Sequence, residues 1–154
     1  MKIYHLQRVQ TLPVTIAEAW TFFSSPENLA RITPPDMHFK ILTSSGGKEI
    51  YAGQLIEYKI RIMPMVSFHW TTEITHVDKP YLFVDEQRFG PYAFWHHQHH
   101  FRTVNDHVEM TDALAYGLPF GIIGRIAHAA FVEQRVKAIF EYRTEILKKI
   151  LGTI

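Results

Sequence analysis

Residues 94–101 read FWHHQHHF and place four of the chain's ten histidines within five positions. Because side chains alternate across a β-strand, an extended stretch divides into two faces. One face begins and ends with an aromatic residue, which predicts that it points into the protein: Trp95, His97, His99 and Phe101. The other face is mostly polar and is expected to point to solvent: His96, Gln98 and His100. The stretch therefore predicts a strand whose inner face carries two histidines.

Alternation of the same kind recurs along the sequence and predicts further strands. The candidate strands are residues 2–11, 38–43, 55–63, 67–78, 81–88, 94–103 and 107–117. Turn-forming residues separate the candidate strands from residue 38 onward, and strands joined by short turns pair as antiparallel neighbours. Most of the chain is therefore expected to form one antiparallel sheet.

Helices are predicted on either side of the six later strands. Thr15 and Glu18 form a capping-box pattern at the start of a first helix, and Pro26 begins a second short helix that ends near Thr33. Residues 121–151 predict one long helix with a single buried face. That face is expected to comprise Ile122, Ile126, Ala129, Val136, Phe140, Arg143 and Leu147. The prediction is a single α+β domain over residues 1–154, in which a curved sheet wraps around the long helix.

The predicted inner faces of the sheet carry many side chains that are only partly apolar: Tyr58, Trp70, Trp95, His97, His99, Asp112 and Tyr116. Burying polar groups is costly unless they have partners. Either they form an internal hydrogen-bonded network in a filled core, or they line a cavity. In 81–88 both faces are plausible inner faces, and we expect Asp85 and Gln87, two positions apart, to point inward together.

Several motifs resemble those of a known family. The chain carries FFS-PENL-ITPP in residues 22–35, FVDEQ-GPY-WxHxHxF in 83–101, DxxxYxLPFG in 112–121 and IFEYR in 139–143. These resemble bacterial proteins of the START-like, or SRPBCC, superfamily, and the resemblance covers nearly the whole chain. It implies a helix-grip fold with an apolar ligand cavity. It implies no particular reaction, because the superfamily contains carriers, sensors and enzymes.

A hydrophobic or aromatic small molecule is the ligand that this pattern favours, because such sites are mostly apolar with a few polar groups. Tyr58, Trp70, Trp95 and Phe140 would supply apolar surface. The polar end of the ligand would be met by a second set: Asp85, Gln87, His97, His99, Asp112 and Tyr116.

Two other uses of the histidines remain as alternatives. His97 or His99 with Asp112 could transfer protons, as a polyketide cyclase or dehydratase requires. A metal ion would need a third ligand such as Asp85 or Asp112. No third ligand has a diagnostic spacing, so the sequence predicts neither a metal nor another cofactor.

Composition excludes several classes of partner. The formal net charge is +1, and no basic run alternates with aromatic residues, so nucleic acid is not an expected partner. The chain has no cysteine, which excludes thiolate sites and fits a cytoplasmic location. It shows no signal peptide and no apolar run of about 20 residues. The apolar residues 121–131 predict transient membrane contact, a lid or a homodimer contact.

Overall fold

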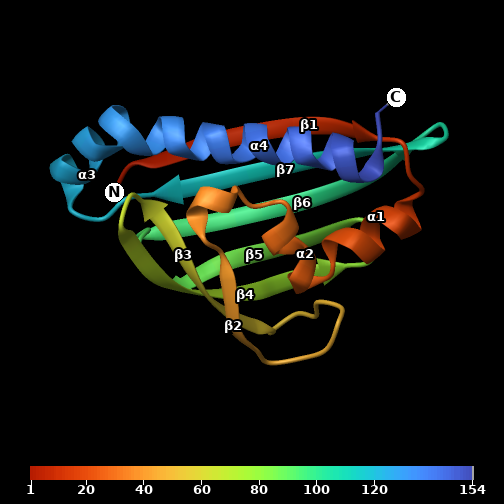
Figure 1. Cartoon of the computed structure of the whole chain (residues 1–154), viewed down its shortest axis with the longest axis horizontal. Coiled ribbons are helices and arrows are strands. Elements are labelled where there is room, and N and C mark those ends of the chain that lie inside the picture. Colours follow the sequence, from red (N-terminus) through yellow and green to blue (C-terminus); the bar gives the residue numbers. More distant parts are fainter. Residues whose placement is uncertain (154) are drawn as a thin grey trace.

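Seven antiparallel strands form one curved sheet in the computed structural model, which describes residues 1–153 (Figure 1). The strands are β1 (Ile3–Leu12), β2 (Lys40–Ser44), β3 (Leu55–Met63), β4 (Val66–Asp78), β5 (Leu82–Phe89), β6 (Phe94–Val104) and β7 (His107–Gly117). Their order across the sheet is β1-β7-β6-β5-β4-β3-β2, so each of β2 to β7 pairs with its neighbour in sequence. The predicted strands are confirmed, with boundaries that differ by one or two residues.

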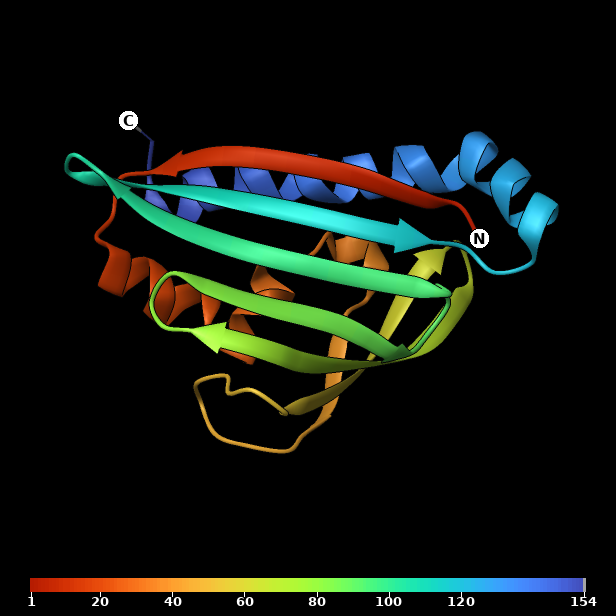
Figure 2. The same cartoon turned by 180° about the vertical axis from the view of Figure 1, so that it is seen from behind.

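The helices lie together on one side of this sheet, as the two opposite views show (Figures 1 and 2). The elements that follow β1 are α1 (Ile16–Phe23), α2 (Pro26–Arg31) and the short 3₁₀ helix η1 (Pro35–Met37). After β7 come α3 (Gly121–Ala127), the π-helical turn η2 (His128–Val132) and α4 (Glu133–Leu151). The capping box at the start of α1 is present, since Thr15 and Glu18 exchange hydrogen bonds. The predicted α+β class and the single long C-terminal helical segment are therefore confirmed.

The inner faces of the strands are as the alternation predicts. The residues predicted to point inward on β3, β4, β6 and β7 are buried apart from two that are half-buried, Phe68 and Trp95. On the outer face of β6, His96, Gln98 and His100 are half-buried and hydrogen-bonded in a row, so they are less exposed than predicted. On β5, Asp85 and Phe83 face inward with the histidines of β6.

The start of the long C-terminal segment differs from its prediction. Ile122 and Ile126 are 73% and 64% exposed, whereas Gly124 and His128 are the buried residues. A π-turn contains one more residue than an α-turn, so η2 rotates the preceding helix by about one position. The predicted stripe holds after the turn, where Val136, Phe140, Arg143 and Leu147 are buried.

The solid part of the core lies where α1 packs against β6 and β7. The indole ring of Trp20 meets the rings of Phe83 and Phe101 edge to face, with centroids 6.0 and 6.3 Å away. Leu12, Val108 and Leu147 are fully buried in the same core. Within residues 1–153, no helix combines the length and apolar character needed to cross a membrane.

Candidate functional site

A cavity of about 170 Å³ lies between the sheet and α4. Side chains of β3, β4, β5 and β6 form one wall, and α1, α2, η1 and α4 form the other. Most of them are aliphatic or aromatic. An apolar cavity of about 150 Å³ is large enough for a benzene ring, so this space suits a small organic molecule.

Seven of the ten predicted site residues line this cavity: Tyr58, Trp70, Asp85, Trp95, His97, His99 and Phe140. The remaining three, Gln87, Asp112 and Tyr116, are not part of its wall. Direct contact between these three and a ligand is therefore not what the geometry indicates, and each has another partner.

Gln87 holds the hairpin between β5 and β6. Its amide donates a hydrogen bond to the Tyr92 carbonyl at 2.6 Å, and its carbonyl accepts one from the Tyr92 N–H at 3.1 Å. Tyr92 is buried and lines the cavity, with its ring centroid 4.8 Å from that of Trp95. Gln87 therefore positions a wall residue that the sequence had indicated only as part of a turn.

Tyr116 is bonded to the start of the C-terminal helical segment. Its hydroxyl lies 2.9 Å from Nε2 of His128, and the His128 ring stacks on Tyr4 with centroids 3.4 Å apart. Because His128 lies in the π-turn, this contact fixes η2 against β1 and β7.

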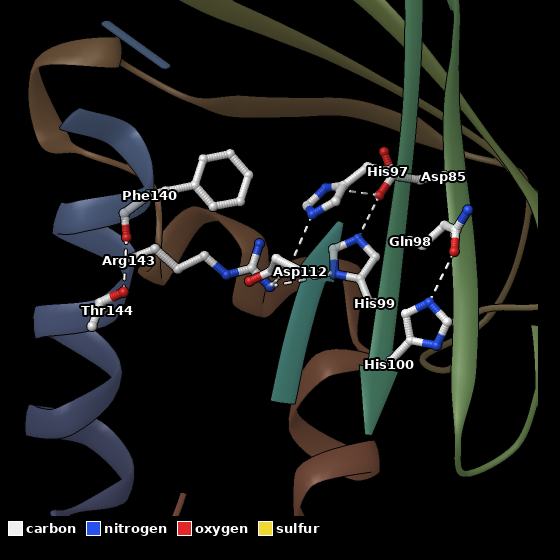
Figure 3. Close-up of polar contacts among 9 residues, drawn as sticks. All are labelled: Asp85, His97, Gln98, His99, His100, Asp112, Phe140, Arg143 and Thr144. Atoms are coloured by element: carbon white, nitrogen blue, oxygen red, sulfur yellow. Dashed lines mark hydrogen bonds and ion pairs between the residues drawn. The ribbon is translucent and has the colours of Figure 1, made fainter. Parts of the chain in front are cut away.

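Two carboxylates and the two buried histidines form a closed network at the cavity wall (Figure 3). Oδ1 of Asp112 lies 2.9 Å from Nε2 of His97 and 3.2 Å from Nδ1 of His99. Oδ2 of Asp85 lies 2.6 Å from Nε2 of His99 and 3.5 Å from Nδ1 of His97. Each carboxylate therefore approaches both imidazoles, Asp112 from behind and Asp85 from the cavity side.

Arg143 completes the network from α4. Its guanidinium reaches from the helix to β7 and lies 3.3 Å from Oδ1 of Asp112, as Figure 3 shows. Both side chains are buried, and the guanidinium also lies over the ring of Phe23. A buried charge needs a partner of opposite sign, and this pair supplies one to each residue.

The network sets the charges of its members. Burial raises the pKa of Asp112, but the Arg143 guanidinium and hydrogen bonds from both histidines outweigh it and hold that pKa well below its usual range. Burial also raises the pKa of Asp85, but the hydrogen bond from His99 and the nearby positive charges outweigh it and lower that pKa. Burial and the neighbouring His99 lower the pKa of His97. Burial lowers the pKa of His99 too, but its bonds to Asp112 and Asp85 outweigh this and raise it. These directions favour ionised carboxylates, a protonated His99 and a neutral His97.

A neutral His97 presents a free acceptor to the cavity. Nε2 is within hydrogen-bond distance of Asp112, so it carries the ring proton, and Nδ1 is left with a lone pair. Nδ1 lies 3.5 Å from Oδ2 of Asp85. Two acceptors thus face the same space, and a ligand hydroxyl or N–H placed between them could donate to either.

Aromatic rings cover the wall next to this polar group. The Trp70 ring lies 5.1 Å from Trp95, 5.5 Å from Tyr92 and 5.8 Å from Tyr58, between centroids. Within residues 1–153, the buried Nε1 of Trp70 has no hydrogen-bond partner. Leaving a buried N–H unpaired is costly, and the ring of Trp70 is held in place by packing and not by a hydrogen bond.

Several partly exposed wall residues lie on or near α2, or on α4: Ser25, Pro26, Asn28, Leu29, Thr33 and Ile139. We infer that the cavity opens between these two helices. No residue of α2 is buried, so this short helix is held less firmly than α1. The sequence prediction missed these residues as site residues, although the FFS-PENL-ITPP motif covers most of them.

The architecture described above, a curved sheet closed by a long helix over a cavity, is a helix-grip fold. No protein-family model matches the sequence, and a search of the curated proteins finds no match. Solved structures do match in fold. A protein of Chromobacterium violaceum superposes with a TM-score of 0.72 at 10% identity, over 97% of this chain and 98% of that one.

Two of the matching structures carry the names of enzymes. Truncated norcoclaurine synthase from Thalictrum flavum has a TM-score of 0.68 at 14% identity, covering 99% of this chain and 96% of that one. The Zhui aromatase/cyclase from Streptomyces sp. R1128 has the same TM-score and identity, covering 97% and 96%. At such low identity the similarity shows the fold alone.

Proposed function

We propose that this protein binds a small hydrophobic or aromatic molecule carrying at least one hydroxyl or N–H group. The observation that carries the proposal is the composition of the cavity wall, which is mostly apolar and carries a cluster of buried polar groups at Asp85, His97, His99 and Arg143. Sites for small organic ligands combine these two features. Burying about 300 Å² of apolar ligand surface would contribute roughly 7 kcal/mol before the costs of ordering.

The polar group gives the ligand a direction. Nδ1 of His97 and the carboxylate of Asp85 would accept hydrogen bonds from it. A flat ring would pack against Trp95 and Phe140, next to these acceptors. A phenol or an enol fits this end of the cavity.

Binding of 2-naphthol and of naphthalene to chelator-treated protein tests the proposal. We expect wild-type protein to prefer 2-naphthol by roughly tenfold, because one net hydrogen bond contributes about 1 kcal/mol or somewhat more. His97→Ala should remove that preference and leave naphthalene binding in place. His100→Ala, on the outer face of the same strand, is the control and should change neither affinity.

Equal losses for the two probes in His97→Ala would contradict the assigned role of His97. Failure of wild-type protein to bind either probe would contradict the proposal that the cavity takes a bicyclic aromatic molecule.

A second candidate function is proton transfer in a cyclase or dehydratase reaction. The specific observation in its favour is that His97 faces the cavity with Nδ1 free while Asp112 holds Nε2 from behind. This is how a general base is oriented by a carboxylate. Turnover of a linear poly-β-ketone thioester by wild-type protein, lost in His97→Gln but kept in His100→Gln, would support it. Unchanged turnover in His97→Gln would remove it.

A further inference from the structure

We propose that Asp85, His97 and His99 bind a divalent transition-metal ion, of which Zn²⁺ is the type, at the polar end of the cavity. One donor atom from each of these side chains lies within 4.8 Å of the other two. The inference does not rest on the proposed organic ligand, since it follows from the donor atoms alone.

The sheet itself brings the three donors together. His97 and His99 are two positions apart on β6, so they share a face, and Asp85 on β5 is the cross-strand partner of His97. Asp85 is therefore the diagonal neighbour of His99, within reach of both rings. The sequence spacing between Asp85 and the histidines does not reveal this, because the register of the two strands creates it.

The nitrogens that face Asp85 are the ones that a metal ion would use. These are Nδ1 of His97, 3.5 Å from Oδ2 of Asp85, and Nε2 of His99, 2.6 Å from the same oxygen. Ligand atoms at about 2.0–2.2 Å from a tetrahedral zinc ion lie roughly 3.3–3.6 Å from one another. Of these two distances only the shorter must lengthen, by roughly 0.7–1 Å.

Asp112 occupies the position that supports metal-binding histidines in other proteins. Its Oδ1 lies 2.9 Å from Nε2 of His97 and 3.2 Å from Nδ1 of His99, which are the opposite nitrogens of the two rings. A carboxylate that accepts from the far nitrogen fixes the ring and increases its basicity as a ligand. One oxygen atom does this for both imidazoles.

The fourth coordination position would open into the cavity. Asp85, His97 and His99 all line the cavity, whereas Asp112 behind them does not. Two imidazoles and one carboxylate with an open position suit Zn²⁺ or Fe²⁺. The open position would hold water or an oxygen atom of the organic molecule.

The test uses the metal ion alone, with no organic ligand. Chelator-treated full-length protein is titrated with Zn²⁺ by calorimetry and with Co²⁺ by visible absorption. We expect one ion per chain and a Co²⁺ spectrum typical of four- or five-coordination. Asp85→Asn and His97→Gln should each weaken binding by at least a hundredfold. Asp112→Asn should weaken it by about 10- to 100-fold, as loss of a supporting carboxylate does.

The matched controls are His96→Gln and His100→Gln, because both residues lie on the outer face of β6. Neither should alter the affinity for Zn²⁺. Imidazole nitrogen shifts of wild-type protein, recorded by NMR with Zn²⁺, identify the bound nitrogens without any variant. We expect the nitrogens that bind Zn²⁺ to be Nδ1 of His97 and Nε2 of His99.

Absence of Zn²⁺ binding by wild-type protein would overturn the inference. So would coordination through His96 or His100, or an unchanged affinity in a folded His97→Gln variant. These outcomes are independent of the naphthol experiment, which is performed on metal-free protein. Failure of one proposal therefore does not imply failure of the other.

Discussion

The carboxylate of Asp112 accepts a hydrogen bond from Nε2 of His97 at 2.9 Å, although only His97 of the two reaches the cavity. Asp112 is 2% exposed and holds His99 and Arg143 through the same oxygen atom. One buried carboxylate on β7 therefore connects the site to the sheet and the sheet to α4. The stability of the protein and the orientation of its site depend on the same residue.

Asp112→Asn is expected to lower the free energy of unfolding by about 3–5 kcal/mol. The reason is that Arg143 remains buried after its counter-charge has been removed. Urea unfolding followed by tryptophan fluorescence measures the change. The control is Glu109→Gln on the same strand, because Glu109 pairs with an Arg102 side chain that is 72% exposed. An exposed pair contributes about 0–1 kcal/mol. Equal losses in both variants would contradict the role given to Asp112.

His128 is expected to make stability depend on pH. Burial lowers the pKa of His128. The negative charge of Glu133 raises that pKa, whereas the positive charges of Lys2 and Lys137 lower it further. As pH falls below about 6.5, the unfolded chain takes up this proton before the folded chain does. The stability contributed by neutral His128 is therefore present above about pH 6.5 and declines below it, until the folded pKa is reached.

The variant His128→Phe keeps a ring on Tyr4 and loses the hydrogen bond to Tyr116. Wild-type protein should lose more stability than this variant between about pH 7.5 and pH 5, in urea unfolding at both values. A smaller loss in wild-type protein would mean that the folded state favours the protonated ring.

Ile139 is expected to control entry to the cavity. It is a partly exposed wall residue on α4 at the mouth opposite α2. Ile139→Trp should slow association of 2-naphthol by at least about tenfold, while the free energy of unfolding changes by less than about 1 kcal/mol. Stopped-flow fluorescence gives the association rate. Ala138→Trp, exposed on the same helix, is the control. An unchanged rate in Ile139→Trp would place the entrance elsewhere.

Much of this architecture follows from local pattern. Alternation assigned the inner faces of β3, β4, β6 and β7 because each has a polar row opposite an apolar one, as with Lys59 beside Tyr58 and Ile60. β5 was ambiguous for a physical reason, since Phe83 and Val84 are adjacent and both are buried. A strand that is buried on both faces lacks the alternation of apolar and polar residues that identifies an inner face.

The site could be predicted only in part, because its finer contacts join residues by strand register and by turns. The pairing of Asp85 with His97 depends on which residues of β5 and β6 face each other. The bond between Gln87 and Tyr92 depends on the hairpin between those strands. Asp112 was predicted to contact the ligand, but the histidines stand between it and the cavity. Neither composition nor spacing indicates which of these residues contact one another or which of them reach the cavity.

The π-turn η2 behaves as a single inserted residue, and its removal is expected to be tolerated. Deleting the exposed Ala130 should convert η2 into a regular helical turn and leave His128 bonded to Tyr116, because both flanking helices keep their faces. The free energy of unfolding should change by less than about 1 kcal/mol. Deleting Lys137 in α4 should instead rotate everything before it by roughly 100° and cost several kcal/mol, since Val136 would leave the core. Urea unfolding of both variants makes the comparison. Equal losses would show that the extra residue is an essential part of the helix and not an accommodated insertion.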